Sequence, residues 1–196
     1  MRATLVVALL TLTLGVAAAA PAAHRAPAGS CPKAWAAGWT KLANRVHAPV
    51  YCPTWMPNPL DAKIGGQFED IYSIAKDRSY LVSFLEHGDL GSGDVHVNFR
   101  GFPGSTRIPR CPKPVGKGTI TCFQEPFTHV TENGIHATGY QVNWGADQWH
   151  ILLAWHYRGS LYTVSEHVID PYDSSTRVLK NLKRLLNGLV LVRPQG

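Results

Sequence analysis

The feature that most constrains the fold is an alternation of apolar and polar residues with a period of two, which runs from about residue 64 to residue 169. Neighbouring residues of a strand point to opposite faces, so this pattern is typical of half-buried β-strands. It is clearest where Val95, Val97 and Phe99 alternate with polar residues. Residues 101–117 hold four prolines and no such period, and we expect them to form a loop.

Two short turns divide the alternating region into hairpins. Asn133-Gly134 is a strong signal for a two-residue turn, and we expect a second such turn at Arg158-Gly159. Hydrophobic matching across the second turn pairs Trp155 with Tyr162, because a slip by one residue would bring polar residues to the apolar face. The aromatic residues of that face are expected in the core rather than on a sugar-stacking platform: Trp144, Trp149, Trp155 and Tyr162.

Two segments show the period of a helix instead. In residues 32–46, Trp35, Trp39 and Val46 belong to an apolar stripe that ends before Pro49. In residues 174–187, a leucine-rich stripe follows possible N-cap serines and ends at Asn187-Gly188. The sequence therefore predicts an α+β fold, in which an antiparallel meander sheet of about seven or eight strands is flanked by an N-terminal and a C-terminal helix.

The N-terminus indicates export. Arg2 precedes an apolar run from Leu5 to Ala20, and small residues follow as Ala20-Pro21-Ala22, which is the order of a secretory signal peptide. We expect a signal peptide at 1–22, a linker at 23–30 and a single α+β domain at 31–196, so that the mature protein is secreted and extracellular with no membrane span. An uncleaved signal would instead leave an N-terminal anchor.

The chain has four cysteines: Cys31, Cys52, Cys111 and Cys122. In a secreted protein an even number indicates disulfides, and four cysteines allow three pairings. We expect the sequential pairs Cys31–Cys52 and Cys111–Cys122, because local pairing closes short loops. Lipidation of Cys31 is the alternative, but it would leave an odd number of cysteines. Two disulfides would leave no thiol to act as a nucleophile.

The formal net charge of +6 favours anionic partners. Between Arg100 and Gln124 there are five basic residues and no acidic one, and prolines stiffen the segment. We predict that this loop contacts an anionic extracellular polymer or protein, not a nucleic acid; a solvated loop without a partner is the alternative. The candidate binding residues are Arg100, Arg107, Arg110, Lys113 and Lys117.

Nine histidines are the other enrichment. The hairpin register places His150 opposite His167, on the face away from Trp155. Two histidines could hold Zn²⁺ or Cu²⁺ if a loop supplied a carboxylate. An ordinary pair of surface histidines is the simpler interpretation, and we expect neither a metal nor a cofactor.

Two motifs resemble a family of uncharacterised extracytoplasmic bacterial domains, some of them attached to regulators of sigma factors. They are the segment 49–57, which begins Pro-Val-Tyr-Cys-Pro, and the spacing Trp155-x-x-x-Gly159-x-x-Tyr162. The family's first motif has leucine where this chain has Cys52. The resemblance covers about two thirds of the mature chain and implies an α+β sheet domain with a binding or sensing role. It carries over no catalytic residue.

The motifs of common hydrolases are absent from the sequence: it has neither G-x-S-x-G nor H-E-x-x-H. We therefore expect a secreted, disulfide-linked binding or interaction domain without catalytic activity, whose ligand the sequence does not identify. The alternative is a small secreted hydrolase with an unrecognised active site. A deep cleft with two convergent polar side chains would favour the hydrolase.

Overall fold

The computed structural model describes residues 29–58, 60, 74–85, 95–113, 115–143, 148–169 and 174–195, and the backbone of residues 68–69. The expected signal peptide and most of the expected linker lie outside these ranges. The described chain is mixed helix and sheet, with two helices, three antiparallel sheets and two disulfides. Neither of its helices is long and apolar enough to cross a membrane.

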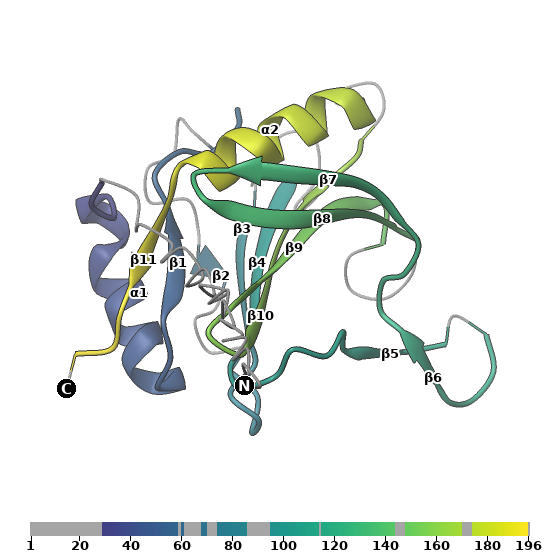
Figure 1. Ribbon diagram of the computed structural model, residues 1–196, viewed down its shortest axis with the longest axis horizontal. Coiled ribbons are helices and arrows are strands. Elements are labelled where there is room, and N and C mark those ends of the chain that lie inside the picture. The colour runs from purple at the N-terminus through teal and green to yellow at the C-terminus, as the bar shows by residue number, and fades with distance from the viewer. Residues whose placement is uncertain are drawn as a thin grey trace, which may run out of the picture.

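The largest sheet of the described chain has seven strands: β2 (Phe68–Glu69), β3 (Tyr80–Leu85), β4 (His96–Phe102), β7 (Pro126–Glu132), β8 (Ile135–Val142), β9 (His150–Tyr157) and β10 (Ser160–His167). Their order is β2-β3-β4-β10-β9-β8-β7, and the sheet twists strongly across the molecule (Figure 1). The prediction of one continuous meander is wrong, because β4 pairs with β10. Two meanders meet there, since the chain leaves the sheet after β4 and returns only at β7.

The two predicted hairpin turns are confirmed. Asn133-Gly134 joins β7 to β8 and Arg158-Gly159 joins β9 to β10, and all four residues have positive φ, as a type I′ turn requires. The second hairpin has the expected register, with Trp155 opposite Tyr162. Turn chemistry and hydrophobic matching therefore both select this pairing.

The position expected for Trp149 is wrong. Its backbone carbonyl accepts a hydrogen bond from the Val168 N–H at 2.9 Å, but its φ of +61° breaks the strand alternation. The side chain consequently turns to solvent and is 61% exposed. Trp144, the other tryptophan expected on this face, lies outside the described residues.

The first helix, α1 (Lys33–Val46), begins after Pro32 and ends at His47, whose φ is +50°. It buries Trp35 and Trp39, whose rings meet Phe84 of β3 and Phe99 of β4 edge to face, at centroid distances of 5.2 and 5.9 Å. Each such buried side chain contributes about 1.5–3 kcal/mol. The helix is thus fixed to the face of the sheet that we call the inner face.

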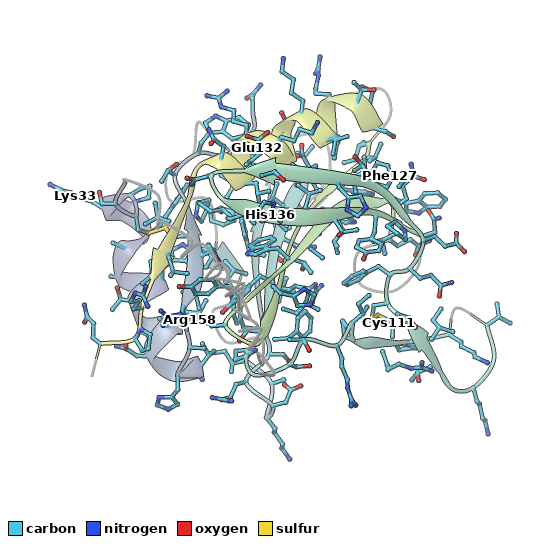
Figure 2. The ribbon with its side chains drawn as sticks, viewed as in Figure 1. Lys33, Cys111, Phe127, Glu132, His136 and Arg158 are labelled. Carbon is cyan, nitrogen blue, oxygen red and sulfur yellow. A yellow bond between two sulfur atoms is a disulfide. The ribbon has the colours of Figure 1, made fainter. Side chains whose placement is uncertain are left out.

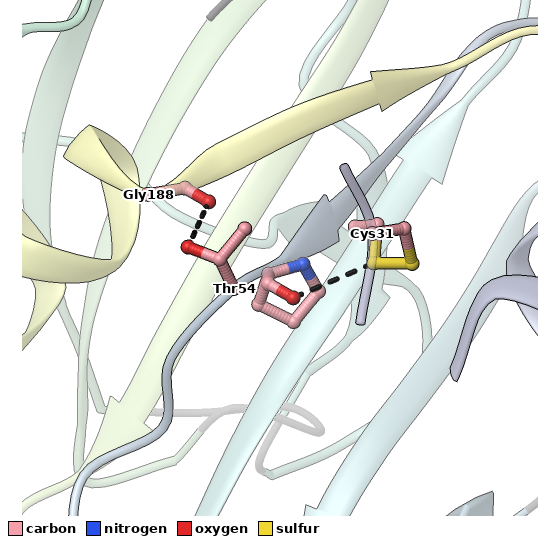
Figure 3. The surroundings of a disulfide bond; sticks show 5 residues. Cys31, Thr54 and Gly188 are labelled. Atoms are coloured by element: carbon pink, nitrogen blue, oxygen red, sulfur yellow. Dashed lines mark hydrogen bonds between the residues drawn. A yellow bond between two sulfur atoms is a disulfide. The ribbon is translucent and has the colours of Figure 1, made fainter. Parts of the chain in front are cut away.

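A two-stranded sheet lies beside α1 in Figure 1. It pairs β1 (Val50–Pro53) with β11 (Leu189–Val192). The Thr54 hydroxyl donates to the Gly188 carbonyl at 2.8 Å beside this pair (Figure 3). The confirmed disulfide Cys31–Cys52 ties the start of α1 to β1. Both ends of the described chain are therefore attached to one unit.

The second helix, α2 (Ser175–Asn187), crosses the top of the sheet in Figure 1. The Ser174 hydroxyl accepts from the Arg177 N–H at 3.3 Å and caps the helix. Its stripe is buried as predicted at Val178, Leu182, Leu185 and Leu186, with Leu179 only partly buried. Lys180, Lys183 and Arg184 face solvent.

Candidate functional site

A long excursion from the sheet, residues 103–125, carries most of the predicted binding residues; we call it the arm. The expectation of an irregular loop over 101–117 is wrong in part. β4 continues to Phe102, and β5 (Arg110–Pro112) pairs with β6 (Thr119–Thr121) as a separate small sheet. This hairpin projects from the body of the protein at the lower right of Figure 1. Prolines hide the strand signal, because they interrupt its alternation.

Covalent and backbone contacts brace the hairpin. The predicted disulfide Cys111–Cys122 is confirmed, and Cys111 marks the hairpin in Figure 2. The Cys122 N–H donates to the Pro109 carbonyl at 2.9 Å, and the Lys113 N–H donates to the Gly118 carbonyl at 3.1 Å. The hairpin is thus closed at both its base and its tip.

The root of the arm packs on the outer face of the sheet, opposite the helices. Phe123 is buried there with Leu152 and Leu161, and its ring lies 4.9 Å from that of Tyr140. His156 Nε2 lies 3.0 Å from the carbonyl oxygen of Thr106; since a carbonyl only accepts, the imidazole donates this bond. The arm is therefore anchored at its root, while the hairpin extends beyond it.

Four of the five predicted binding residues come together on the arm. Arg107, Arg110, Lys113 and Lys117 are all exposed. Arg110 lies along the hairpin and donates from Nε to the Thr119 hydroxyl at 3.2 Å. Residues 103–124 contain no carboxylate. The one carboxylate of the arm is the exposed Glu125 at its end, so the four cations form a surface with a net positive charge.

The fifth predicted binding residue, Arg100, does not lie on the arm. It lies on β4 opposite Thr163 of β10 and is half-buried. It lines a cavity of about 240 Å³ beside Tyr80 and Phe102. The structure thus places Arg100 on the sheet and not on the arm, because β4 continues to Phe102 before the arm begins.

The predicted cross-strand pairing of His150 with His167 is confirmed, and the structure adds a third histidine to the pair. His150 of β9 lies directly opposite His167 of β10, with ring centroids 4.9 Å apart. His96 of β4 joins them, at 4.6 Å from His150 and 5.0 Å from His167. We call these three residues the histidine ladder. His96 was missed because nothing local in the sequence indicates that β4 pairs with β10, some sixty residues later.

The ladder does not form a metal site in the observed orientation of its rings. His150 and His167 stack with an angle of 13° between their planes. Across the described residues, no three His, Cys, Asp or Glu side chains are arranged to hold an ion. What the backbone supplies is the proximity of three imidazoles from three adjacent strands.

Two cavities among the described residues can be compared with the cleft that the hydrolase alternative requires. The cavity beside Tyr80 is smaller than the 300–1,000 Å³ typical of ligand pockets. A groove of about 850 Å³ follows the outward side of α1, and its titratable lining residues are Lys41, Arg45 and His47. Neither cavity is lined by a carboxylate or a cysteine.

Two hydroxyl–imidazole contacts also bear on this alternative. Thr131 Oγ1 lies 3.0 Å from His136 Nδ1, and Thr138 Oγ1 lies 3.4 Å from His129 Nδ1. Both pairs are solvent-exposed contacts between β7 and β8, and Figure 2 shows His136 on this hairpin. They are explained as ordinary cross-strand pairs.

Comparison of the chain with protein-family models, curated proteins and solved structures finds no match.

Proposed function

We propose that this protein is a secreted binding domain that contacts an anionic extracellular polymer through the cations of the arm. One observation carries the proposal: the arm, whose hairpin is braced by a disulfide, extends from the body and exposes four cations, and its single carboxylate is Glu125 at its end. A rigid loop that projects from a packed scaffold is a common way to present binding residues. The two disulfides fit an oxidising compartment, and the resemblance noted above also implies binding or sensing.

A polymer with repeated charges suits the arm better than a single small anion. The cations are distributed along the arm, from Arg107 before β5 to Lys117 at the tip of the hairpin. They line neither of the cavities described above. Val115, which is 86% exposed, stands between Lys113 and Lys117 at the tip and can rest on the polymer backbone. A repeated anion can meet several of these positions at once.

The expected affinity is modest and depends on salt. One exposed ion pair contributes about 0.2–1 kcal/mol, so four pairs together supply roughly 1–4 kcal/mol. Screening shortens the reach of exposed charges to about 10 Å at 0.1 M salt. We therefore expect binding to be strong only where a polymer engages several cations, and to weaken steeply as ionic strength rises.

The test measures binding of the mature protein to immobilised inorganic polyphosphate across a range of NaCl concentrations. One variant replaces Arg107, Arg110, Lys113 and Lys117 with glutamine, which removes the charge and keeps side-chain length. We expect its affinity at low salt to fall at least tenfold. Circular dichroism of the same samples checks that the fold is retained.

A matched variant separates the arm from net charge. It replaces four exposed cations on other elements with glutamine: Lys33, Arg45, Lys180 and Arg193. We expect less than a twofold loss of affinity. Equal losses in the two variants would mean that net charge alone drives binding, and the arm would lose its assigned role. Binding of acidic proteins without binding of polyphosphate would point to a protein partner instead.

A further inference from the structure

We propose that Arg110 determines which anions the arm recognises, because its guanidinium is fixed in place to bind an oxyanion group such as phosphate through two parallel N–H bonds. The Arg110 Nε donates to the Thr119 hydroxyl at 3.2 Å, and its Nη2 donates to the Thr119 carbonyl at 2.8 Å. Within the described chain, the side chains of Arg107, Lys113 and Lys117 form no hydrogen bond. Arg110 is thus the specificity-determining residue of the arm, provided that the arm binds an anionic polymer as proposed above.

The backbone of the hairpin places Arg110 and Thr119 within reach of one another. Arg110 begins β5 and lies opposite Thr121 of β6, so Thr119 is its diagonal neighbour on the same face of the hairpin. Diagonal neighbours in an antiparallel pair are about 7–8 Å apart, which a long side chain can span. The disulfide Cys111–Cys122 joins the residues that follow Arg110 and Thr121. The strand pairing beneath the guanidinium is therefore held covalently.

The two hydrogen bonds to Thr119 leave one edge of the guanidinium free. The planar group carries five N–H donors, and the two that are used, on Nε and Nη2, lie along one edge. The remaining N–H of Nη2 and an N–H of Nη1 are parallel on the neighbouring edge, and such a pair matches two oxygen atoms of a phosphate, sulfate or carboxylate group. Arg110 is exposed, so a polymer outside the protein can reach this edge.

The guanidinium keeps its positive charge for the polymer. Both of its acceptors are uncharged oxygen atoms of Thr119, and the one carboxylate of the arm is Glu125 at its end. A flexible cation loses side-chain freedom when it binds, whereas Arg110 has given up part of that freedom on folding. A lysine at this position would carry the same charge, but its ammonium group is a point charge without the paired donors. Charge and recognition can therefore be separated by substitution.

The experiment compares the wild-type mature protein with Arg110→Lys for binding to immobilised inorganic polyphosphate over a range of NaCl concentrations. We expect Arg110→Lys to lower the affinity about fivefold at every salt concentration, because the paired hydrogen bonds are lost. The slope of log affinity against log salt concentration should stay the same, since it reports the number of charges that are neutralised. The matched control, Arg193→Lys, changes an exposed arginine outside the arm and should bind as the wild type does. Wild-type affinity in Arg110→Lys would overturn the proposal.

Competition by small anions provides a second readout. Sulfate has the paired oxygen atoms that match a guanidinium, whereas chloride does not. At equal ionic strength, sodium sulfate should therefore displace the wild-type protein from polyphosphate more effectively than sodium chloride does, by about twofold. This preference for sulfate should disappear in Arg110→Lys. The same preference in both proteins would show that sulfate acts elsewhere on the surface, and it would contradict the role of Arg110.

We expect Thr119 to act as a positioning residue for the guanidinium. Thr119→Val removes the hydroxyl acceptor without changing the charge and should lower the affinity about threefold, whereas Thr119→Ser should restore it. In an Arg110→Lys background, Thr119→Val should have no further effect, because the two residues act through one interaction. An equal loss of affinity in both backgrounds would mean that Thr119 supports the hairpin and does not position Arg110.

The same measurements separate the role of Arg110 from the function of the arm. If the wild-type protein does not bind polyphosphate, the arm loses its proposed function and Arg110 loses its role with it. If the variant with four glutamines loses binding while Arg110→Lys binds as the wild type does, the arm binds by charge alone. Only the role of Arg110 is then overturned.

Discussion

At the scale of single residues, the inner face is organised around buried tyrosines. The ring of Tyr51 meets those of Trp155 and Tyr162 edge to face, at centroid distances of 5.3 and 5.0 Å. The Tyr162 hydroxyl donates to the Pro49 carbonyl at 2.7 Å. Tyr80 is buried across Gly101 of β4, where a Cβ would collide with its ring. Phenol hydroxyls are therefore held in surroundings that disfavour their charged form.

These tyrosines should make the protein sensitive to alkali. Burial raises the pKa of Tyr51, Tyr80 and Tyr162 above the usual value of about 10, and neighbouring phenols oppose a second negative charge. A raised folded-state pKa contributes stability that is fully present below about pH 10 and is lost as pH rises through the folded values. We expect the three phenols to ionise only as the fold is lost, so that tyrosinate absorbance at 295 nm and circular dichroism change together.

Tyr162→Phe provides the control for that prediction. The variant lacks the hydroxyl bonded to Pro49, so its free energy of unfolding at neutral pH should be lower by about 1 kcal/mol. It also lacks one of the groups that titrate, so stability should fall less steeply above pH 10. Ionisation of all tyrosines in a protein that keeps its native circular dichroism would contradict this account.

At the scale of elements, two adjacent residues of α2 have opposite environments, one in the core and one in solvent. Leu182 is fully buried and Lys183 is exposed. Leu182→Ala should lower the free energy of unfolding by about 2–5 kcal/mol, because it removes a buried isobutyl group and leaves a cavity. Lys183→Ala should change it by less than about 0.5 kcal/mol. Urea denaturation of both variants measures the contrast, and a harmless Leu182→Ala would mean that α2 is detached from the core.

Elements also show what local sequence can and cannot predict. Both helices and the two I′ hairpins follow from patterns within about twenty residues, and so does the proximity of His150 and His167. The pairing of β4 with β10 does not, because sheet order is decided by which long-range contacts bury most apolar surface. For the same reason the sequence predicts two members of the histidine ladder and misses His96. The predicted burial of Trp149 is wrong because its own positive φ ends the strand alternation at that residue.

At the scale of the whole molecule, the two disulfides stabilise different units. Cys31–Cys52 lies in the packed region where α1 meets β1, and Cys52 is completely buried. Cys111–Cys122 braces a hairpin whose packing against the sheet is confined to its root. We therefore expect a cooperative body and an arm that can open without it. The free energy of unfolding can then differ between the body and the arm, so one value does not describe the whole chain.

That division predicts different results from removing each disulfide. Replacing Cys31 and Cys52 with alanine should lower the unfolding free energy of the body by about 2–4 kcal/mol, and thermal denaturation followed by circular dichroism should show it. Replacing Cys111 and Cys122 with alanine should leave the thermal midpoint of the body almost unchanged, because the core contacts persist. The arm should instead become cleavable by trypsin after Arg110 and Lys117 in the native protein. An equal loss of thermal midpoint in both variants would show that the arm unfolds with the core, and that it is part of the scaffold rather than a surface carried by it.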